Sequence, residues 1–149
     1  VAQNNMVNVQ VNTQIDVQPK AQSEAQNLIV KGNTNLLYRA LYNLVENAIR
    51  YNNEEGSVNI TLETRGQEGV IIIADTGVGI APEQRELVFE PFYRVNKSRS
   101  REFGGAGIGL SLVKTILKRH GASITVSENN PQGSVFTIRI PLVDAVDSD

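Results

Sequence analysis

The sequence contains no cysteine and only one histidine, His120. Disulfides, cysteine nucleophiles and thiolate metal sites are therefore excluded, and one histidine cannot form a multi-histidine metal site. An excess of positive charge is also lacking, because the formal net charge is −2. Nucleic acid and anionic membrane surfaces are therefore not expected as partners. No apolar run approaches transmembrane length, and no signal peptide is visible.

The composition is typical of a globular protein, with 40% hydrophobic and 20% charged residues among 149. This length fits one domain with a real core. We expect residues 7–142 to be structured and residues 143–149 to form a polar, acidic tail. Because the chain starts at Val1 and not at Met, we expect it to be a fragment of a longer protein.

The most informative stretch is an apolar run, residues 70–74, that ends in Asp75 and is followed by Gly77 and Gly79. Consecutive apolar residues bounded by turn signals predict a strand that is covered on both faces. A carboxylate at its end is costly unless hydrogen-bond donors surround it, and the two glycines let the backbone turn sharply near a ligand. Such a carboxylate can accept from the amino group of a base, although an Asp-closed turn would show the same residues.

A helix is predicted to start at Asn33 or Thr34, either of which can cap it. Its apolar stripe has helical spacing and consists of Leu37, Leu41, Leu44, Val45 and Ala48. Asn43 and Asn47 lie four residues apart on a second face. Amide oxygens are hard ligands that suit Mg²⁺, while the alternative is an exposed polar face. Glu46 is expected to face solvent.

The remaining pattern predicts several strands and two more helices. Strands are expected at residues 7–17, 28–30, 58–62, 124–128 and 134–141, with 58–62 paired antiparallel to 70–74. A helix is expected to begin at Pro82 and to present Leu87, Val88 and Phe89 on its apolar side. Another helix runs through Leu110 to Leu117, and His120 at its end is expected to be a surface residue that complements the helix dipole.

A basic loop separates these two helices. Arg94, Lys97, Arg99 and Arg101 fall within eight positions, which indicates either an anion-binding loop or a solvated one. The glycines at 104, 105, 107 and 109 follow, and glycines that open a helix present free N–H groups to an anion. The length of this stretch without a regular pattern suggests a functional lid.

Together and in this order, these segments resemble the ATP-binding catalytic domain of sensor histidine kinases. Residues 43–51 are similar to its N box, 75–79 to its first glycine box, 89–92 to its F box, 105–110 to its second glycine box and 133–136 to its last glycine strand. The resemblance implies a Bergerat-type α+β two-layer sandwich, with a mixed, mostly antiparallel sheet of about five strands packed on about three helices.

The resemblance also implies roles for individual residues. Asp75 accepts from the adenine amino group, and Asn47 coordinates the Mg²⁺ that bridges the phosphates of ATP. Asn43 supports that site, Arg50 approaches the phosphates and Tyr51 stacks near adenine. The implied catalytic residues are Asn43, Asn47 and Arg94. The other nucleotide-binding residues are Gly77, Gly79, Ile80, Phe92, Gly105, Gly107, Ile108, Gly109 and Leu110.

As a function, the resemblance implies transfer of the γ-phosphoryl group of ATP to a histidine on a separate dimerisation domain, within two-component signal transduction. A response regulator would be reached through that domain, which this chain lacks. The chain would be the cytoplasmic, monomeric part of a membrane-anchored bacterial sensor, with no direct membrane contact. One departure is Ala106, where the family often has Ser or Thr.

Three alternatives are weighed against this interpretation. ATPases of the gyrase, mismatch-repair and chaperone class have a glutamate four residues before the metal-binding asparagine, and here that residue is Asn43. An anti-sigma-factor serine kinase has similar length, but the box at residues 89–92 and the long basic loop disfavour it. A catalytically silent nucleotide-binding module is disfavoured by the presence of Asn47 and Asp75.

Overall fold

The computed structural model describes residues 5–9, 28–53, 55–93 and 109–143 of the chain. In chain order its elements are β1 (Asn5–Val9), β2 (Leu28–Gly32), α1 (Thr34–Arg50), β3 (Val58–Arg65), β4 (Glu68–Asp75), the 3₁₀ helices η1 (Pro82–Gln84) and η2 (Leu87–Phe89), α3 (Gly109–Arg119), β5 (Ser123–Glu128) and β6 (Ser134–Pro141). Residues 10–17 of the first predicted strand, the basic loop and the acidic tail from residue 144 lie outside this part of the chain.

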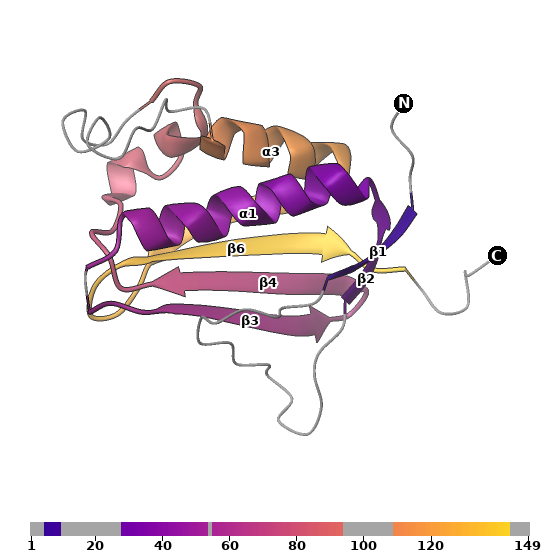
Figure 1. Ribbon diagram of the computed structural model, residues 1–149, viewed down its shortest axis with the longest axis horizontal. Helices are drawn as coiled ribbons and strands as arrows, with labels where there is room; N and C mark the ends of the chain where they lie inside the picture. Colours follow the sequence, from indigo (N-terminus) through magenta and orange to yellow (C-terminus); the bar gives the residue numbers. More distant parts are fainter. Residues whose placement is uncertain (1–4, 10–27, 54, 94–108, 144–149) are drawn as a thin grey trace.

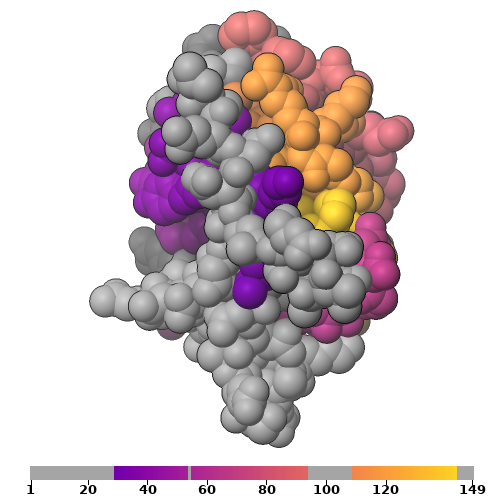
Figure 2. Space-filling model, turned by 90° about the vertical axis from the view of Figure 1, so that its right-hand side faces the viewer, coloured from indigo at the N-terminus to yellow at the C-terminus, as the bar shows by residue number. Residues whose placement is uncertain are grey.

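The molecule has two layers, a sheet and a pair of helices that cover one face of it (Figure 1). The sheet has four strands in the order β3-β4-β6-β5, and β1 pairs with β2 in a separate two-stranded sheet. Seen from the end at which β1 and β2 lie, α1 and α3 are side by side above the sheet (Figure 2). The predicted two-layer α+β sandwich is confirmed. Within the described residues, every strand pair is antiparallel, so these residues do not contain the parallel pair that a mixed sheet would include.

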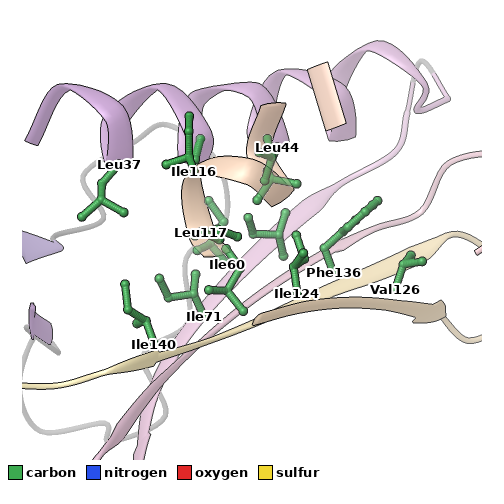
Figure 3. Close-up of a cluster of buried hydrophobic side chains, with 14 of the residues drawn as sticks. Leu37, Leu44, Ile60, Ile71, Ile116, Leu117, Ile124, Val126, Phe136 and Ile140 are labelled. Carbon is green, nitrogen blue, oxygen red and sulfur yellow. The ribbon is translucent and has the colours of Figure 1, made fainter. Parts of the chain in front are cut away.

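The core lies between the sheet and the two helices (Figure 3). Antiparallel register places Ile60, Ile73 and Phe136 next to one another on adjacent strands, and alternation turns all three toward the helices. From above, Leu37 and Leu44 of α1 and Leu117 of α3 point toward the sheet, and Ile116 of α3 is buried beside α1. Burial of these apolar side chains is the main stabilising term and holds α1 in a fixed position over β4.

Helix α1 begins as the sequence predicts. Asn33 is its N-cap, and the side-chain oxygen of Asn33 accepts a hydrogen bond of 3.0 Å from the N–H of Leu36. The exposed side of the helix carries Tyr38 and Tyr42, whose rings stack with centroids 6.0 Å apart. None of the helices that the described residues form is long and apolar enough to cross a membrane.

The prediction of an α-helix that begins at Pro82 is wrong. Two short 3₁₀ helices stand in its place, and Leu87, expected on the apolar side, is 44% exposed. Val88 and Phe89 are buried as predicted. The physical reason is visible in the sequence, because residues 83–86 are all polar and give a continuous helix no apolar stripe to bury.

The predicted interaction of His120 with the C-terminal end of α3 is confirmed, but the residue is more than the surface residue that was expected. The ring is half-buried, and its Nε2 accepts a hydrogen bond of 3.0 Å from the N–H of Asn33. Because Nε2 is an acceptor, Nδ1 carries the proton and donates to the carbonyl of Ile116 at 2.8 Å. Gly32 leaves the space for the ring, since a Cβ there would lie 2.3 Å from Cδ2 of His120.

Candidate functional site

Asp75 ends β4 and is buried, with 7% of its surface exposed. Its Oδ1 accepts hydrogen bonds from the N–H of Gly77 at 2.9 Å and from the N–H of Ser134 at 3.2 Å. Within the described part of the chain, Oδ2 has no hydrogen-bond partner. Burial raises the pKa of this carboxyl group, and the two N–H donors lower it to a smaller extent. The side chain is thus a fixed acceptor with one oxygen left for a ligand.

The glycine turn after Asp75 lies against the end of α1. The N–H of Val78 donates to the carbonyl of Tyr51 at 3.2 Å, and a Cβ at Gly77 would lie 2.2 Å from that same oxygen. Gly77 is therefore required for close approach of the two segments. Tyr51 in turn donates its N–H to the carbonyl of Asn47 at 3.2 Å, so the turn and the predicted metal ligand are connected through one residue.

The loop between α1 and β3 fixes the next residue of the turn. The hydroxyl of Thr76 accepts from the N–H of Ser57 at 2.8 Å and donates to Oδ1 of Asn52 at 3.0 Å. Nδ2 of Asn53 donates to the carbonyl of Thr76 at 3.0 Å. These supporting residues were missed by the sequence analysis, and the available signal was the pair of asparagines directly after the helix.

The turn between β5 and β6 holds the same segment from the opposite side. Nδ2 of Asn129 donates to the backbone carbonyl of Asp75 at 2.8 Å, and Nε2 of Gln132 donates to the carbonyl of Gly77 at 3.0 Å. Gly133 has φ 116°, and a Cβ there would lie 1.9 Å from the carbonyl oxygen of Asp75. From the sequence, residues 133–136 were assigned to a glycine strand but Asn129 and Gln132 were given no role, so their hydrogen bonds to Asp75 and Gly77 were not predicted.

Asn43 and Asn47 are half-buried on α1, between the buried Leu44 and Ala48 on one side and solvent on the other. Neither asparagine side chain has a hydrogen-bond partner among the residues that the structure describes. Both amides are therefore available to a ligand. A carboxylate-rich metal site is not formed by the described residues, which contain no group of three or more His, Cys, Asp or Glu side chains able to hold a metal ion.

Two further predicted residues of α1 lie at its C-terminal end. Arg50 is exposed and pairs with Glu46 at 3.5 Å, which also places Glu46 on the solvent side, partly exposed. Tyr51 is half-buried and caps the helix. The arginine that was predicted to approach phosphates is thus paired with a carboxylate, in a weak surface ion pair.

The remaining predicted site residues are spread around this centre. Gly79 has φ 78° and lies against Gly133, while Ile80 and Leu110 are partly buried against the core. Phe92 is 74% exposed and has φ 66°, an unfavourable conformation for a residue other than glycine. Gly109 begins α3. The predictions for Arg94, Gly105, Ala106, Gly107 and Ile108 fall outside the described residues.

Residues 32–144 match the family described as histidine kinase-, DNA gyrase B- and HSP90-like ATPase. The sensor histidine kinase RppB of Synechocystis sp. is 48% identical over 111 residues, which are 74% of this chain and 24% of RppB. The sensor-like histidine kinase SenX3 of Mycobacterium tuberculosis is 44% identical over 124 residues, 83% of this chain and 30% of SenX3. The chain therefore spans about a quarter to a third of these relatives.

Solved structures agree with this assignment. The mycobacterial sensor histidine kinase MprB superposes with a TM-score of 0.74 at 28% identity, covering 86% of this chain and 80% of that one. Histidine kinase ThkA, solved in complex with the response regulator protein TrrA, gives 0.68 at 27% identity over 87% of this chain and 34% of that one. This chain belongs to the family of histidine kinase-, DNA gyrase B- and HSP90-like ATPases. Within that family, its fold is that of the ATP-binding catalytic domain of sensor histidine kinases.

Proposed function

We propose that this chain binds ATP with Mg²⁺ and transfers the γ-phosphoryl group to a histidine on a separate dimerisation domain. The observation that carries the proposal is the buried Asp75, whose Oδ1 is held by two N–H groups while Oδ2 has no partner in the described part of the chain. Membership of the ATPase family supports ATP as the ligand, and similarity to sensor histidine kinases supports a histidine as the acceptor.

Asp75 is proposed to bind the adenine base. Its free Oδ2 can accept a hydrogen bond from the exocyclic amino group of adenine, whereas guanine has a carbonyl at the corresponding position and would present an acceptor to an acceptor. Gly77 supports this role, because the missing side chain lets the turn after Asp75 pack against the carbonyl of Tyr51, and its N–H holds Oδ1 of the carboxylate. The site thereby selects against guanine by leaving a buried acceptor unpaired.

Asn47 is proposed to be the Mg²⁺ ligand, with Asn43 supporting it one helical turn earlier. The donor set fits Mg²⁺, which takes few protein ligands and completes its coordination with waters and phosphate oxygens. When bound, Mg²⁺ neutralises charge on the phosphates. The protein contribution is positioning, because α1 is held over the sheet by the buried Leu44 and Ala48, each next in sequence to one of these asparagines.

Transfer to a protein is favoured over hydrolysis of ATP. An amide has no basic site that takes a proton from water at neutral pH, so Asn43 cannot act as a general base. Phosphoryl transfer needs positioning and charge neutralisation, both of which the asparagine pair can contribute to. His120 is not suited to be the acceptor, because both of its ring nitrogens are engaged in hydrogen bonds.

The partners and the cellular setting are part of the same proposal. The acceptor histidine would be supplied by the dimerisation domain of the parent protein, and a response regulator would take the phosphoryl group from it. The complex of ThkA with TrrA shows that a related kinase binds such a regulator. We place this chain on the cytoplasmic side of a membrane-anchored bacterial sensor, as a monomer when it is isolated.

Phosphotransfer to a separate domain tests the proposal directly. The chain is mixed with Mg²⁺, ATP labelled at the γ-phosphate and the dimerisation domain of its parent. Acid-labile label on that domain is expected, and it should be lost when the acceptor histidine is changed to glutamine. Label that remains on this chain, or release of free phosphate at the rate of a dedicated ATPase without transfer, would contradict it.

A further inference from the structure

The turn between β5 and β6 and the first residue of β6 form several hydrogen bonds with the segment from Asp75 to Gly77, here called the Asp75 segment. Asn129 bonds the carbonyl of Asp75, the N–H of Ser134 bonds its carboxylate and Gln132 bonds the carbonyl of Gly77. These contacts begin where the β4–β6 ladder ends, since the last paired residues are Ala74 and Val135. Hydrogen bonds from the turn and from the first residue of β6 thus hold the chain just beyond the end of this ladder.

The orientation of the Asn129 side chain is fixed at both ends. Its Oδ1 accepts from the N–H of Asn130 at 2.8 Å, and its Nδ2 donates to the carbonyl of Asp75 at 2.8 Å. An amide with one end on a donor and the other on an acceptor can adopt only one of its two flipped arrangements. Asn129 is also half-buried, so its hydrogen bond to Asp75 is partly shielded from water.

We propose that Asn129, assisted by Gln132, is a positioning residue that sets how Asp75 is presented to the base, and so contributes to selection of adenine. This inference rests on the proposed binding of adenine by Asp75. Two hydrogen bonds hold Asp75 from this side. The side chain of Asn129 donates to its backbone carbonyl, and the N–H of Ser134 donates to its Oδ1. With both held, the free Oδ2 has little freedom to rotate away from a ligand, which favours pre-organised binding.

The sequence offers a matched pair of variants. Asn129→Asp replaces the donor that faces the Asp75 carbonyl with a charged acceptor, and Asn130→Asp makes the same charge change at the neighbouring residue. Asn130 is exposed, and only its backbone N–H takes part in the contacts described above. Any general repulsion of the nucleotide by the added charge is therefore shared by the two variants, whereas loss of the Asp75 contact is not.

The experiment measures the affinities of Mg-ATP and Mg-GTP by calorimetry, together with the midpoint of thermal unfolding. Asn129→Asp is expected to weaken ATP binding by about tenfold or more, and Asn129→Ala by roughly three- to tenfold. GTP binding should change by less than about twofold in Asn129→Ala, and in Asn129→Asp by no more than it does in Asn130→Asp, because guanine does not use the Asp75 acceptor. Asn130→Asp and Asn130→Ala should leave the ratio of the two affinities unchanged. Gln132→Ala should lower the ratio of ATP affinity to GTP affinity less than Asn129→Ala does, because the side chain of Gln132 is exposed.

Two results would overturn the inference. Equal losses in Asn129→Asp and Asn130→Asp would show an effect of charge alone, and equal losses for ATP and GTP in Asn129→Ala would show a purely structural role. Asp75→Asn separates this failure from failure of the proposed function. If Asp75→Asn weakens ATP binding while Asn129→Ala does not, only the positioning role is wrong. If Asp75→Asn leaves ATP affinity unchanged, the assignment of Asp75 to adenine is wrong and the inference falls with it.

Discussion

The imidazole of His120 accepts a hydrogen bond from the backbone N–H of Asn33, a residue 87 positions earlier in the chain. Asn33 caps α1 with its side chain, and His120 follows the last residue of α3 and donates to the carbonyl of Ile116 within that helix. A single ring therefore joins the start of one helix to the end of the other. Because α1 carries both asparagines of the candidate site, this link helps to fix their position over the sheet.

His120→Ala is expected to lower the free energy of unfolding by about 1–3 kcal/mol, because it leaves the N–H of Asn33 and the carbonyl of Ile116 without these partners. Urea denaturation is the measurement. Arg119→Ala serves as the control, since Arg119 is exposed and such substitutions usually stay within about 0.5 kcal/mol. Equal effects of the two variants would show that the two hydrogen bonds of the His120 ring do not contribute to stability.

Gly32→Ala is expected to destabilise the protein by about 1–3 kcal/mol through overpacking. The added Cβ would lie 2.3 Å from Cδ2 of His120 and 2.9 Å from Cδ1 of Leu37. In the His120→Ala background the same substitution should cost less, because the nearer of the two clashes is gone. A double-mutant cycle in urea measures this coupling, and a coupling energy of zero would contradict the predicted contact.

Asp75→Asn is expected to weaken ATP binding by roughly 1.5–3 kcal/mol, the range for hydrogen bonds to charged groups. The amide can still accept from Gly77 and Ser134, but its NH₂ then faces the amino group of adenine, donor against donor. Calorimetry with ATP and GTP measures the loss. Unchanged ATP affinity would remove Asp75 from the base-binding site.

The same variant makes a prediction about the pH dependence of stability. Burial raises the pKa of Asp75 above its ordinary value of 3.8, so the ionised carboxylate costs stability at neutral pH. That cost disappears as the pH falls through the raised pKa, where the folded state takes up its proton. Asp75→Asn should therefore be at least as stable as the natural protein at pH 7, and this advantage should shrink in acid. Thermal unfolding as a function of pH is the measurement. The prediction is contradicted if the stability of Asp75→Asn relative to the natural protein is lower at pH 7 than in acid.

Asn47→Ala should abolish phosphotransfer while the fold persists. Its side chain makes no hydrogen bond to the described residues, and alanine is the better helix former by roughly 0.7 kcal/mol or less, so stability should be unchanged or slightly higher. Circular dichroism and thermal unfolding check the fold, and labelled ATP checks transfer. Asn35→Ala, at an exposed position of the same helix, should retain full activity. Transfer at the natural rate by Asn47→Ala would exclude it as the metal ligand.

Features that depend on neighbouring residues could be predicted from the sequence. The Asn33 cap and the placement of Asp75 at the end of an apolar strand follow from local spacing, and the structure confirms them. Of the predicted stripe of α1, Leu37, Leu44 and Ala48 are buried, while Leu41 and Val45 are partly buried. Contacts between distant segments left no such signal. The bond from His120 to Asn33 and the bond from Asn129 to Asp75 depend on how layers and turns meet, which neither periodicity nor capping rules encode.

The segment from Asp75 to Val78 is held on one side by residues 51–53 and Ser57 and on the other by residues 129–134, and these two flanks lie far apart in the chain. No contiguous fragment that lacks either flank can therefore form it, and local fraying at one flank would dismantle it. Nucleotide that binds only the complete arrangement must raise the stability of the whole domain by mass action, by about 2.7 kcal/mol at a hundred times the dissociation constant. Hydrogen exchange of the most protected amides in β4 and β6 should consequently slow as ligand is added, because exchange there requires global opening.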